Sequence, residues 1–335
     1  MKWSKILHFF LYMWYNVCGD DMKKGLKLTL KLLFFVFIIM IILFNEQITT
    51  YIVKNYVYNK NVTLEISKNE YSLNRNYEAV QITDDFIAHD YQHLLNIMYT
   101  ILDSGNKEFA FFCDDKYTDC LSDLDNIIPS DDSNKYDILA DINNLVHPYN
   151  SYTKLTVIMN NYGKVIVKIS KQYTDNQIKY INEQVDKIDK EIIKSGMTNK
   201  QKLQAFHDYI INTTKYDKER ANDMDNRNYK NSISHTAYGL LKNHIALCGG
   251  YSDIMSIFAA KYNIQNMRIS ADKHVWNLVN LDNKWYHIDA TWDDPITNTG
   301  SQILIEDYFL INTESLHYKD SQEHNFNANF YKEAK

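Results

Sequence analysis

Three residues in the second half of the chain carry side chains suited to covalent catalysis. Cys248 stands just before two glycines at the start of a helix-like segment, and His274 and Asp289 follow in two successive strand-like runs. A thiol at a helix N-terminus feels the partial positive charge of that end, so more of it is present as the nucleophilic thiolate. An imidazole can activate such a thiol, and a carboxylate can fix the tautomer of the imidazole. These residue types in this order predict a nucleophilic thiol with two supporting groups.

The glycines after the cysteine, Gly249 and Gly250, have a predicted role of their own. They allow a tight turn and leave backbone N–H groups exposed at the start of the helix. Such N–H groups can stabilise the oxyanion that forms when a carbonyl carbon is attacked. We therefore expect an oxyanion site beside the thiol.

The segments that position these residues are typical of one helix followed by three strands. Ile254, Ile257, Phe258 and Tyr262 are spaced to place one face of the helix against a core. The expected strands cover Met267–Ala271, His274–Leu281 and Lys284–Thr291.

A two-residue turn is expected between the last two strands, because Asp282 and Asn283 both tolerate the positive φ angle that such a turn demands. With that turn, His274 lies opposite Thr291. Side chains alternate along a strand, so His274 and Asp289 share one face as diagonal neighbours, roughly 7–8 Å apart at the backbone. A slip of one residue would place the two side chains on opposite faces.

Three sequence blocks around these residues resemble the core blocks of transglutaminase-like domains, with bacterial surface members as the nearest match. The blocks run from Ala246 to Ser252, from His274 to Val279 and from Trp285 to Pro295. Lys215-Tyr216-Asp217 and Tyr308-Phe309-Leu310 also resemble family features. The resemblance covers roughly residues 198–312 and implies a papain-like α+β core.

The resemblance also implies a catalytic triad, with Cys248 as nucleophile, His274 as base and Asp289 as the group that orients the imidazole. The implied activity is thiol-dependent acyl transfer or hydrolysis on protein or peptide amides, through a thioester on the cysteine. The expected partner is a protein or cell-wall peptide substrate at the cell surface. Neither a cofactor nor a metal ion is expected.

Two alternatives stay open. One is a catalytically silent surface or assembly module that retains the fold, since fold does not imply function. The other is a zinc-dependent hydrolase. His287 precedes Asp289 by two residues, where it could share a metal ion with the triad. His89 and His93 have the i, i+4 spacing of zinc ligands on a helix, with Asp90 where metalloproteases carry Glu, and no third ligand is evident.

We expect four segments along the chain: residues 1–45 with a signal anchor, a smaller α+β domain over 46–195, the catalytic domain over 196–312, and a C-terminal tail over 313–335. Thr198 and Gln201 form a capping box that marks the start of the third segment. The second segment holds a strand over Val62–Ile66, a helix over Asp84–Leu102, a strand over Phe109–Cys113, a hairpin over Tyr152–Met159 and Lys164–Ser170, and a helix over Gln177–Ile193.

The N-terminal region predicts attachment to a membrane. An apolar run covers residues 32–44, and four lysines between residues 23 and 31 precede it. As a helix the run is about 20 Å long, against a hydrocarbon core of roughly 30 Å. The lysines place the N-terminus in the cytoplasm and everything after Phe44 outside. We expect a single-pass signal anchor in the cell membrane with an extracytoplasmic main body. A cleaved signal peptide and a buried core helix are the alternatives, and Met22 is a second candidate start.

The net charge indicates which partners to expect, and the cysteines indicate a possible disulfide. The net charge is −6, whereas a nucleic-acid-binding face would be basic, so no nucleic acid is expected. In an extracytoplasmic main body, Cys113 and Cys120 are close enough in sequence to form a small disulfide loop. Two reduced cysteines are the alternative.

Overall fold

A computed structural model describes residues 24–45, 48–49, 64–128, 137–222, 233–271, 273–294 and 304–335. The chain separates into two compact units, Met1–Thr63 and Leu64–Lys335. The described elements mix helices with antiparallel and short parallel strands, which confirms the α+β class expected from the sequence.

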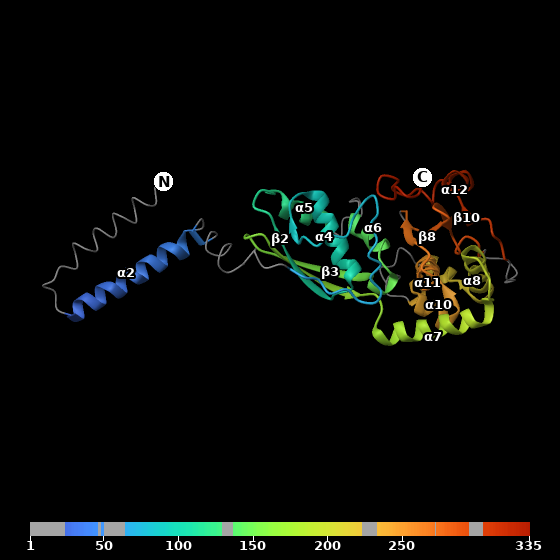
Figure 1. Cartoon of the computed structure of the whole chain (residues 1–335), viewed down its shortest axis with the longest axis horizontal. Coiled ribbons are helices and arrows are strands. Elements are labelled where there is room, and N and C mark those ends of the chain that lie inside the picture. Colours follow the sequence, from blue (N-terminus) through green and yellow to red (C-terminus); the bar gives the residue numbers. More distant parts are fainter. Residues whose placement is uncertain are drawn as a thin grey trace. The chain divides into compact units, whose positions relative to one another are not determined.

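In the first unit, the apolar run of residues 32–44 lies inside one helix, α2 (Lys24–Phe44), drawn in blue in Figure 1. Most of its described apolar side chains are exposed; Phe35, for example, is 70% exposed. Lys27 and Lys31 fall within the helix, so its uncharged part is shorter than the core of a bilayer. Among the described residues, no helix combines the length and the apolar character needed to cross a membrane. The expected membrane helix is therefore not supported. The alternative start at Met22 lies outside the described residues.

The second unit contains two four-stranded sheets, with the orders β1-β2-β4-β3 and β10-β9-β8-β7, and a parallel pair of short strands, β5 and β6. The strands are β1 (Ile87–Ala88), β2 (Glu108–Cys113), β3 (Tyr152–Met159), β4 (Lys164–Lys171), β5 (Lys215–Tyr216), β6 (Ile245–Ala246), β7 (Asn266–Ser270), β8 (Val275–Leu281), β9 (Lys284–Ile288) and β10 (Phe309–Ile311). The helices are α4 (Tyr91–Ser104), α5 (Cys120–Ile127), α6 (Ile138–Asn144), α7 (Asp175–Ile192), α8 (Asn199–Thr213), α9 (Lys218–Asn222), α10 (Ala237–Asn243), α11 (Cys248–Lys261) and α12 (Thr313–Lys319), with the 3₁₀ turns η2 (Pro148–Asn150) and η4 (Ile233–His235).

The first sheet and its helices form the N-terminal part of this unit. Strand β2 and the β3–β4 hairpin confirm the predicted strands with nearly the same bounds. Gly163 in the hairpin turn has a φ of 82°, which glycine adopts without strain. Leu94 and Met98 of α4 share one core with Phe111 and Val167 of the sheet, and Figure 1 shows α4 beside β2 and β3.

The helix predicted over Asp84–Leu102 begins later than expected. Asp90 is the N-cap of α4, because its side chain accepts a hydrogen bond from the His93 N–H at 2.8 Å. The residues just before it form β1, which pairs in parallel with β2. Strand pairing has therefore overridden the helical spacing of this segment. The strand predicted over Val62–Ile66 is wrong where it is described, since residues 64–66 lie outside any strand.

The disulfide expected from the sequence forms between Cys113, at the end of β2, and Cys120, at the start of α5. Their Cα atoms are 5.9 Å apart. The bond closes a loop of a few residues and fixes the start of α5 to the end of β2, an inner strand of the first sheet. Within the described part of the chain, Cys248 is the free cysteine.

Two consecutive helices begin with capping boxes. Thr198 and Gln201 cap α8 as predicted, and Thr174 and Gln177 cap α7 in the same way. In each box the threonine side chain accepts a hydrogen bond from the glutamine N–H, and the glutamine side chain accepts one from the threonine N–H. The segment boundaries expected near residues 195 and 312 stay predictions within this one compact unit.

The β8–β9 hairpin has the predicted two-residue turn. Asp282 and Asn283 have φ angles of 52° and 62°, as a type I′ turn requires. Asn277 pairs with Ile288, which is the expected register. His274 directly precedes β8 and Asp289 directly follows β9, so the hairpin carries both residues at the same end of the sheet.

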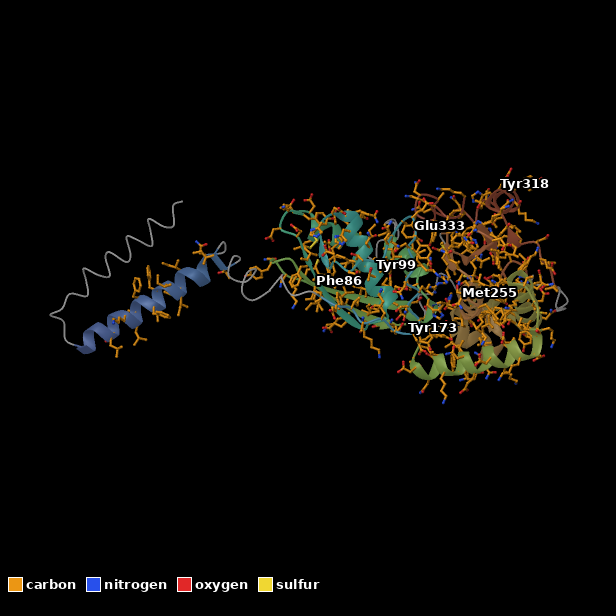
Figure 2. All side chains as sticks on the ribbon, in the orientation of Figure 1. Phe86, Tyr99, Tyr173, Met255, Tyr318 and Glu333 are labelled. Atoms are coloured by element: carbon orange, nitrogen blue, oxygen red, sulfur yellow. A yellow bond between two sulfur atoms is a disulfide. The ribbon has the colours of Figure 1, made fainter. Side chains whose placement is uncertain are left out.

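Two hydrophobic cores fill the second unit. Phe86 belongs to the first, and Tyr173 and Met255 belong to the second; Figure 2 labels all three. Consecutive residues of β8 face different cores, Leu278 the first and Val279 the second. The second sheet is therefore covered on both faces, which gives the hairpin a rigid support.

A buried ion pair ties α11 to this framework. Arg268 of β7 donates to Asp253 of α11 at 2.6 Å, to the Asn143 carbonyl at 2.5 Å and to Ser151 Oγ at 2.6 Å. Removing one partner of such a buried pair typically costs about 3–5 kcal/mol. The helix that carries Cys248 is thus anchored to the same sheet as His274.

Candidate active site

Cys248 is the first residue of α11, as the sequence predicts. The turn η4 passes very close to this helix start. A Cβ atom on Gly249 would lie 2.7 Å from the His235 carbonyl oxygen, and one on Gly250 would lie 2.8 Å from the Ser234 carbonyl oxygen. Glycine alone permits this approach. The two glycines therefore let the η4 backbone pack directly against the turn that carries the thiol.

The backbone N–H groups of this turn are only partly available for an oxyanion. The Gly250 N–H donates to the Leu247 carbonyl at 2.8 Å, so the oxyanion role expected of Gly250 is wrong. The Leu247 N–H donates to the Ser234 carbonyl, also at 2.8 Å. The N–H groups of Cys248 and Gly249 are then the candidates for stabilising an oxyanion beside the thiol.

The hairpin brings His274 and Asp289 together. His274 Nε2 donates to Asp289 Oδ2 at 2.5 Å, and the two side chains are only 8% and 1% exposed. The thiol of Cys248 lies close enough to the same imidazole to help raise its pKa. Since Nε2 is directed at Asp289, Nδ1 is the atom left for the thiol. The structure therefore joins His274 to Asp289 by a hydrogen bond, with the Cys248 thiol near the same imidazole.

The Asp289 carboxylate is fixed at both oxygens. Its Oδ1 accepts hydrogen bonds from the backbone N–H groups of Thr291 at 2.9 Å and Trp292 at 3.2 Å. Its Oδ2 accepts from imidazoles. A carboxylate held in this way cannot rotate, so it fixes the plane of the His274 ring.

The charges of the pair follow from these contacts. Burial alone would lower the pKa of His274, but the Asp289 carboxylate and the Cys248 thiol together raise it to about 10. Burial alone would raise the pKa of Asp289, but His274 and His324 hold it far below its ordinary value. At neutral pH the pair is therefore an imidazolium and a carboxylate.

A second histidine, His324, completes the site and was missed in the sequence. Its Nε2 donates to Asp289 Oδ2 at 2.9 Å, and its Nδ1 is 3.0 Å from Asp320 Oδ2. The side chain is fully buried. His324 lies in a polar stretch of the C-terminal segment, and its i, i+4 spacing from Asp320 was the only local signal. Nothing in that stretch indicates a contact with a residue thirty-five positions away.

Aromatic rings surround the imidazoles. The Trp276 ring stacks on His274 at a centroid distance of 5.4 Å, and Trp276 itself is buried. Trp292 lies edge-on to His274 at 6.5 Å. Tyr216 is close enough for Cys248 to contribute to its electrostatics; burial, with Cys248 next, raises its pKa to about 12. The Tyr216 hydroxyl therefore stays protonated beside the thiol.

The site could also hold a metal ion, although with different ligands from those expected. His274, Asp289 and His324 offer donor atoms within 4.8 Å of one another, and all three are buried. His287 is not part of this group. Its Nδ1 accepts from Trp276 Nε1 and its Nε2 donates to Thr313 Oγ1, both at 3.0 Å. Burial lowers the pKa of His287 to about 3, so His287 is a neutral structural residue.

The two aspartates that follow in the third sequence block have structural contacts. Asp293 accepts hydrogen bonds from His207 of α8 at 3.1 Å and from the Tyr308 N–H at 2.9 Å. Asp294 accepts from the Tyr251 hydroxyl of α11 at 2.5 Å. The loop after Asp289 is thus fastened to both neighbouring helices, which holds the carboxylate in place.

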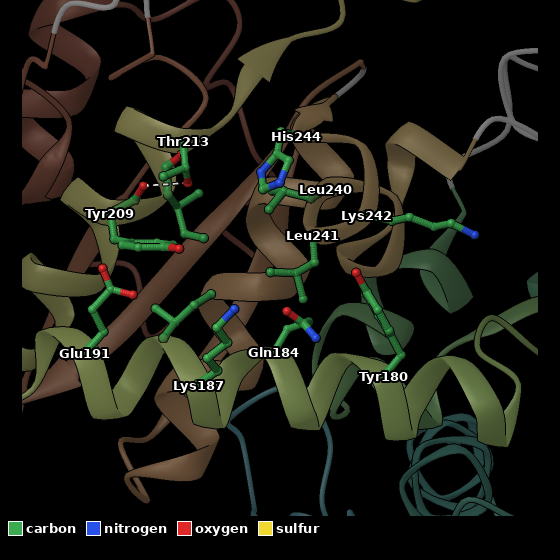
Figure 3. Close-up of a pocket in the computed structure, with 12 residues that line it drawn as sticks. Tyr180, Gln184, Lys187, Glu191, Tyr209, Thr213, Leu240, Leu241, Lys242 and His244 are labelled. Atoms are coloured by element: carbon green, nitrogen blue, oxygen red, sulfur yellow. Dashed lines mark hydrogen bonds between the residues drawn. The ribbon is translucent and has the colours of Figure 1, made fainter.

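A separate pocket of about 340 Å³ lies between α7, α8 and α10 and is shown in Figure 3. Lys187 and Glu191 line it from α7, Tyr209 from α8 and Leu241 from α10. None of the four residues of the site described above borders it.

Comparisons with known proteins add little to this geometry. The family model of the RecG N-terminal helical domain matches residues 158–228, well under half of the chain. In the structure that stretch includes the end of β3 and the whole sheet strand β4 as well as the helices α7 and α8. No curated protein matches the chain.

Among solved structures, the chain is similar to one described as "Crystal structure of a TGase". The identity is 18% and the TM-score 0.32, and the match covers 48% of this chain and 49% of the other. The chain thus matches about half of the length of that structure. A similarity this weak leaves the function to be argued from the chain's own residues.

Proposed function

We propose that the chain is an enzyme of the transglutaminase-like superfamily that performs thiol-dependent acyl transfer or hydrolysis on protein or peptide amides. The observation that carries this is the hydrogen bond from His274 to Asp289, with the Cys248 thiol near the same imidazole. Covalent thiol catalysis requires an activated thiol, an imidazole beside it and a carboxylate that orients the imidazole. Here the thiol lies at a helix start, the imidazole is charged and the carboxylate is fixed. The three sequence blocks that resemble this family contain these same residues.

In the first step, Cys248 Sγ attacks the carbonyl carbon of an amide. The new C–S bond places negative charge on the carbonyl oxygen, and the N–H groups of Cys248 and Gly249 are the nearest donors to it. His274 then gives its Nδ1 proton to the departing nitrogen, and the C–N bond breaks. A thioester on Cys248 and a free amine are left.

In the second step, His274 accepts a proton from the attacking group. Water gives the acid and completes a hydrolysis, whereas a primary amine gives a new amide and completes an acyl transfer. In both cases the C–S bond breaks and Cys248 leaves as the thiolate. Asp289 stays ionised throughout, since its pKa lies far below the ordinary value.

His324 acts in this scheme as a positioning residue. It touches neither thiol nor substrate, but it donates to the same Asp289 oxygen as His274. With Asp320 behind it, His324 extends the hydrogen bonds from His274 and Asp289 to a chain of four groups. The oxygen that holds His274 is therefore itself held from the opposite side.

The substrate is proposed to be a surface protein or a cell-wall peptide, with the chain attached to the cell membrane through residues 32–44. Two features support an extracytoplasmic site: the Cys113–Cys120 disulfide, which persists in oxidising compartments, and the lysines that precede the apolar run. Protease added to intact protoplasts should degrade the main body. Protection until lysis would contradict this location.

The enzymatic test uses the full chain in a mild detergent, which keeps the exposed apolar face of α2 from self-association. The chain is incubated with casein and a dansylated primary amine, and products are identified by mass spectrometry. We expect either amine incorporation or backbone cleavage. Cys248→Ser and His274→Ala should each abolish the product, whereas His317→Ala, a histidine on the exposed helix α12, should not.

The same assay separates the two alternatives. A chelator should leave the activity unchanged; loss of activity on chelation, restored by Zn²⁺, would favour a zinc-dependent hydrolase at the group formed by His274, Asp289 and His324. No product from any amide substrate, together with slow alkylation of Cys248 by iodoacetamide, would favour a catalytically silent module.

A further inference from the structure

We propose a divalent metal site, suited to Zn²⁺, formed by Asp85, His89 and His93 on the surface beside β1 and α4. One donor atom from each residue lies within 4.8 Å of the other two. Two imidazoles and one carboxylate are a usual protein ligand set for Zn²⁺, with a fourth position open to water. The spacing of His89 and His93 suggested such a pair, and the structure supplies a third ligand from before β1.

The carboxylate of the site comes from Asp85 and not from Asp90. Asp90 is committed to capping α4, where it accepts from the His93 N–H at 2.8 Å. Asp85 Oδ2 instead lies 2.9 Å from His89 Nε2. The Asp85 Oδ1 atom accepts the Ile87 N–H at 2.9 Å, which fixes this carboxylate with Oδ2 directed at the imidazole.

His89 is oriented from its other side by a second carboxylate. Its Nδ1 lies 2.9 Å from Asp114 Oδ2, while Asp114 Oδ1 accepts the Lys116 N–H at 2.8 Å. Zinc-bound histidines commonly donate their second N–H to a carboxylate, which sets the tautomer and turns the ligating nitrogen toward the metal. Asp114 is in place to do this for His89 Nε2.

The cluster is crowded with negative charge that a cation would balance. Asp85 and Asp114 each place a carboxylate oxygen 2.9 Å from one nitrogen of His89. His93 stacks on His89 at a centroid distance of 5.2 Å, so its ring is adjacent to the same place.

Small side-chain movements complete the geometry. Two ligands of a tetrahedral Zn²⁺ ion lie about 3.4 Å apart, because each bond is about 2.0–2.2 Å long. The side chains of Asp85 and His89 are 51% and 45% exposed, so rotations of this size meet little packing resistance. The bound ion would join the segment before β1 to the first turn of α4.

The test is Zn²⁺ binding to the full chain in detergent, by equilibrium dialysis with metal analysis. The Cys248→Ala variant is used, so that the outcome is independent of the proposed function. We expect one Zn²⁺ per chain, with loss of binding in both His89→Ala and His93→Ala. Asp114→Asn should weaken binding about 10–100-fold, as outer-shell changes do. His317→Ala, the matched surface control, and His274→Ala should both bind as the parent does.

Calorimetry supplies a second readout that depends on the geometry. Titration of Zn²⁺ should fit one site per chain, and Asp85→Asn, which keeps both histidines but removes the carboxylate ligand, should weaken that binding. Absence of stoichiometric binding in the parent would overturn the proposed site. So would binding that survives loss of His89 and His93 together but disappears in His274→Ala. His89 is exposed and His93 and Asp114 are half-buried, so circular dichroism verifies that each variant is folded.

Discussion

Replacing Asp289 by asparagine removes one negative charge from the centre of the candidate site with little change in volume. In the parent, Asp289 and the thiol of Cys248 raise the pKa of His274 to about 10 against the opposing effect of burial. Without the carboxylate, only the thiol opposes the lowering of the His274 pKa by burial. We expect the pKa of His274 in Asp289→Asn to fall to its ordinary value of 6.5 or below.

The consequence for the thiol can be worked out from these values. At pH 7.5 an imidazole with a pKa of about 10 is fully protonated, whereas one with a pKa of 6.5 is about one-tenth protonated. The population of imidazolium that stabilises the Cys248 thiolate thus falls about tenfold. The difference is greatest between about pH 6.5 and pH 10 and shrinks toward pH 5, where both imidazoles are charged.

Because the pKa of His274 is raised on folding, its contribution to stability is fully present below about pH 6.5 and is lost as pH rises through about 10.

The assay is the rate of Cys248 alkylation by iodoacetamide between pH 5 and pH 10, followed by intact mass. We expect Asp289→Asn to react about tenfold more slowly than the parent at pH 7.5, with its rate converging on the parental rate toward pH 5. Asp282→Asn is the matched control, since Asp282 sits in the exposed turn of the same hairpin with a φ of 52° that asparagine also adopts.

Equal alkylation rates of parent and Asp289→Asn across this whole range would refute the reasoning. The carboxylate would then not control the charge of His274, and the hydrogen bond between His274 and Asp289 would have only a structural role. A parallel slowing in the Asp282→Asn control would point instead to a disturbed hairpin.

Three further changes test other parts of the structure. His324→Ala should lower kcat by tenfold or more with a smaller effect on KM, and His324→Gln, which can still donate to Asp289, should recover part of it. Replacing both Cys113 and Cys120 by serine should lower the free energy of unfolding by about 2 kcal/mol, since the closed loop is short, and urea denaturation measures it. Insertion of one residue into the turn of the β8–β9 hairpin should abolish activity more completely than Asp289→Asn, because it moves the carboxylate to the opposite face.

The parts of the site that were predictable from the sequence depend on local rules. Asp282 and Asn283 both favour positive φ, which fixed the length of the turn and with it the register of β8 and β9. Strand alternation then placed His274 and Asp289 on one face. The helix start at Cys248 followed from its glycines and the apolar spacing after them. Each step needed only neighbouring residues.

The parts that were missed depend on contacts between distant segments. Phe86 and the residues after it have helical spacing, yet Ile87 and Ala88 pair with β2. The close approach of η4 to Gly249 could not be inferred, because it depends on the position of a loop that precedes the cysteine. His324 reaches the site from a segment without periodic pattern. Such positions depend on how the whole unit packs, and the spacing of neighbouring residues does not indicate that packing.

The position of His324 explains how one carboxylate can serve both steps of the proposed reaction. When His274 gives its Nδ1 proton to the leaving amine, the ring loses its charge and its hydrogen bond to Asp289 weakens. His324 still donates to the same Oδ2 atom, and the N–H groups of Thr291 and Trp292 still hold Oδ1. The carboxylate therefore keeps its ionised state and its orientation while His274 is neutral. The ring is then ready to accept a proton from water or an amine in the geometry in which it lost the first.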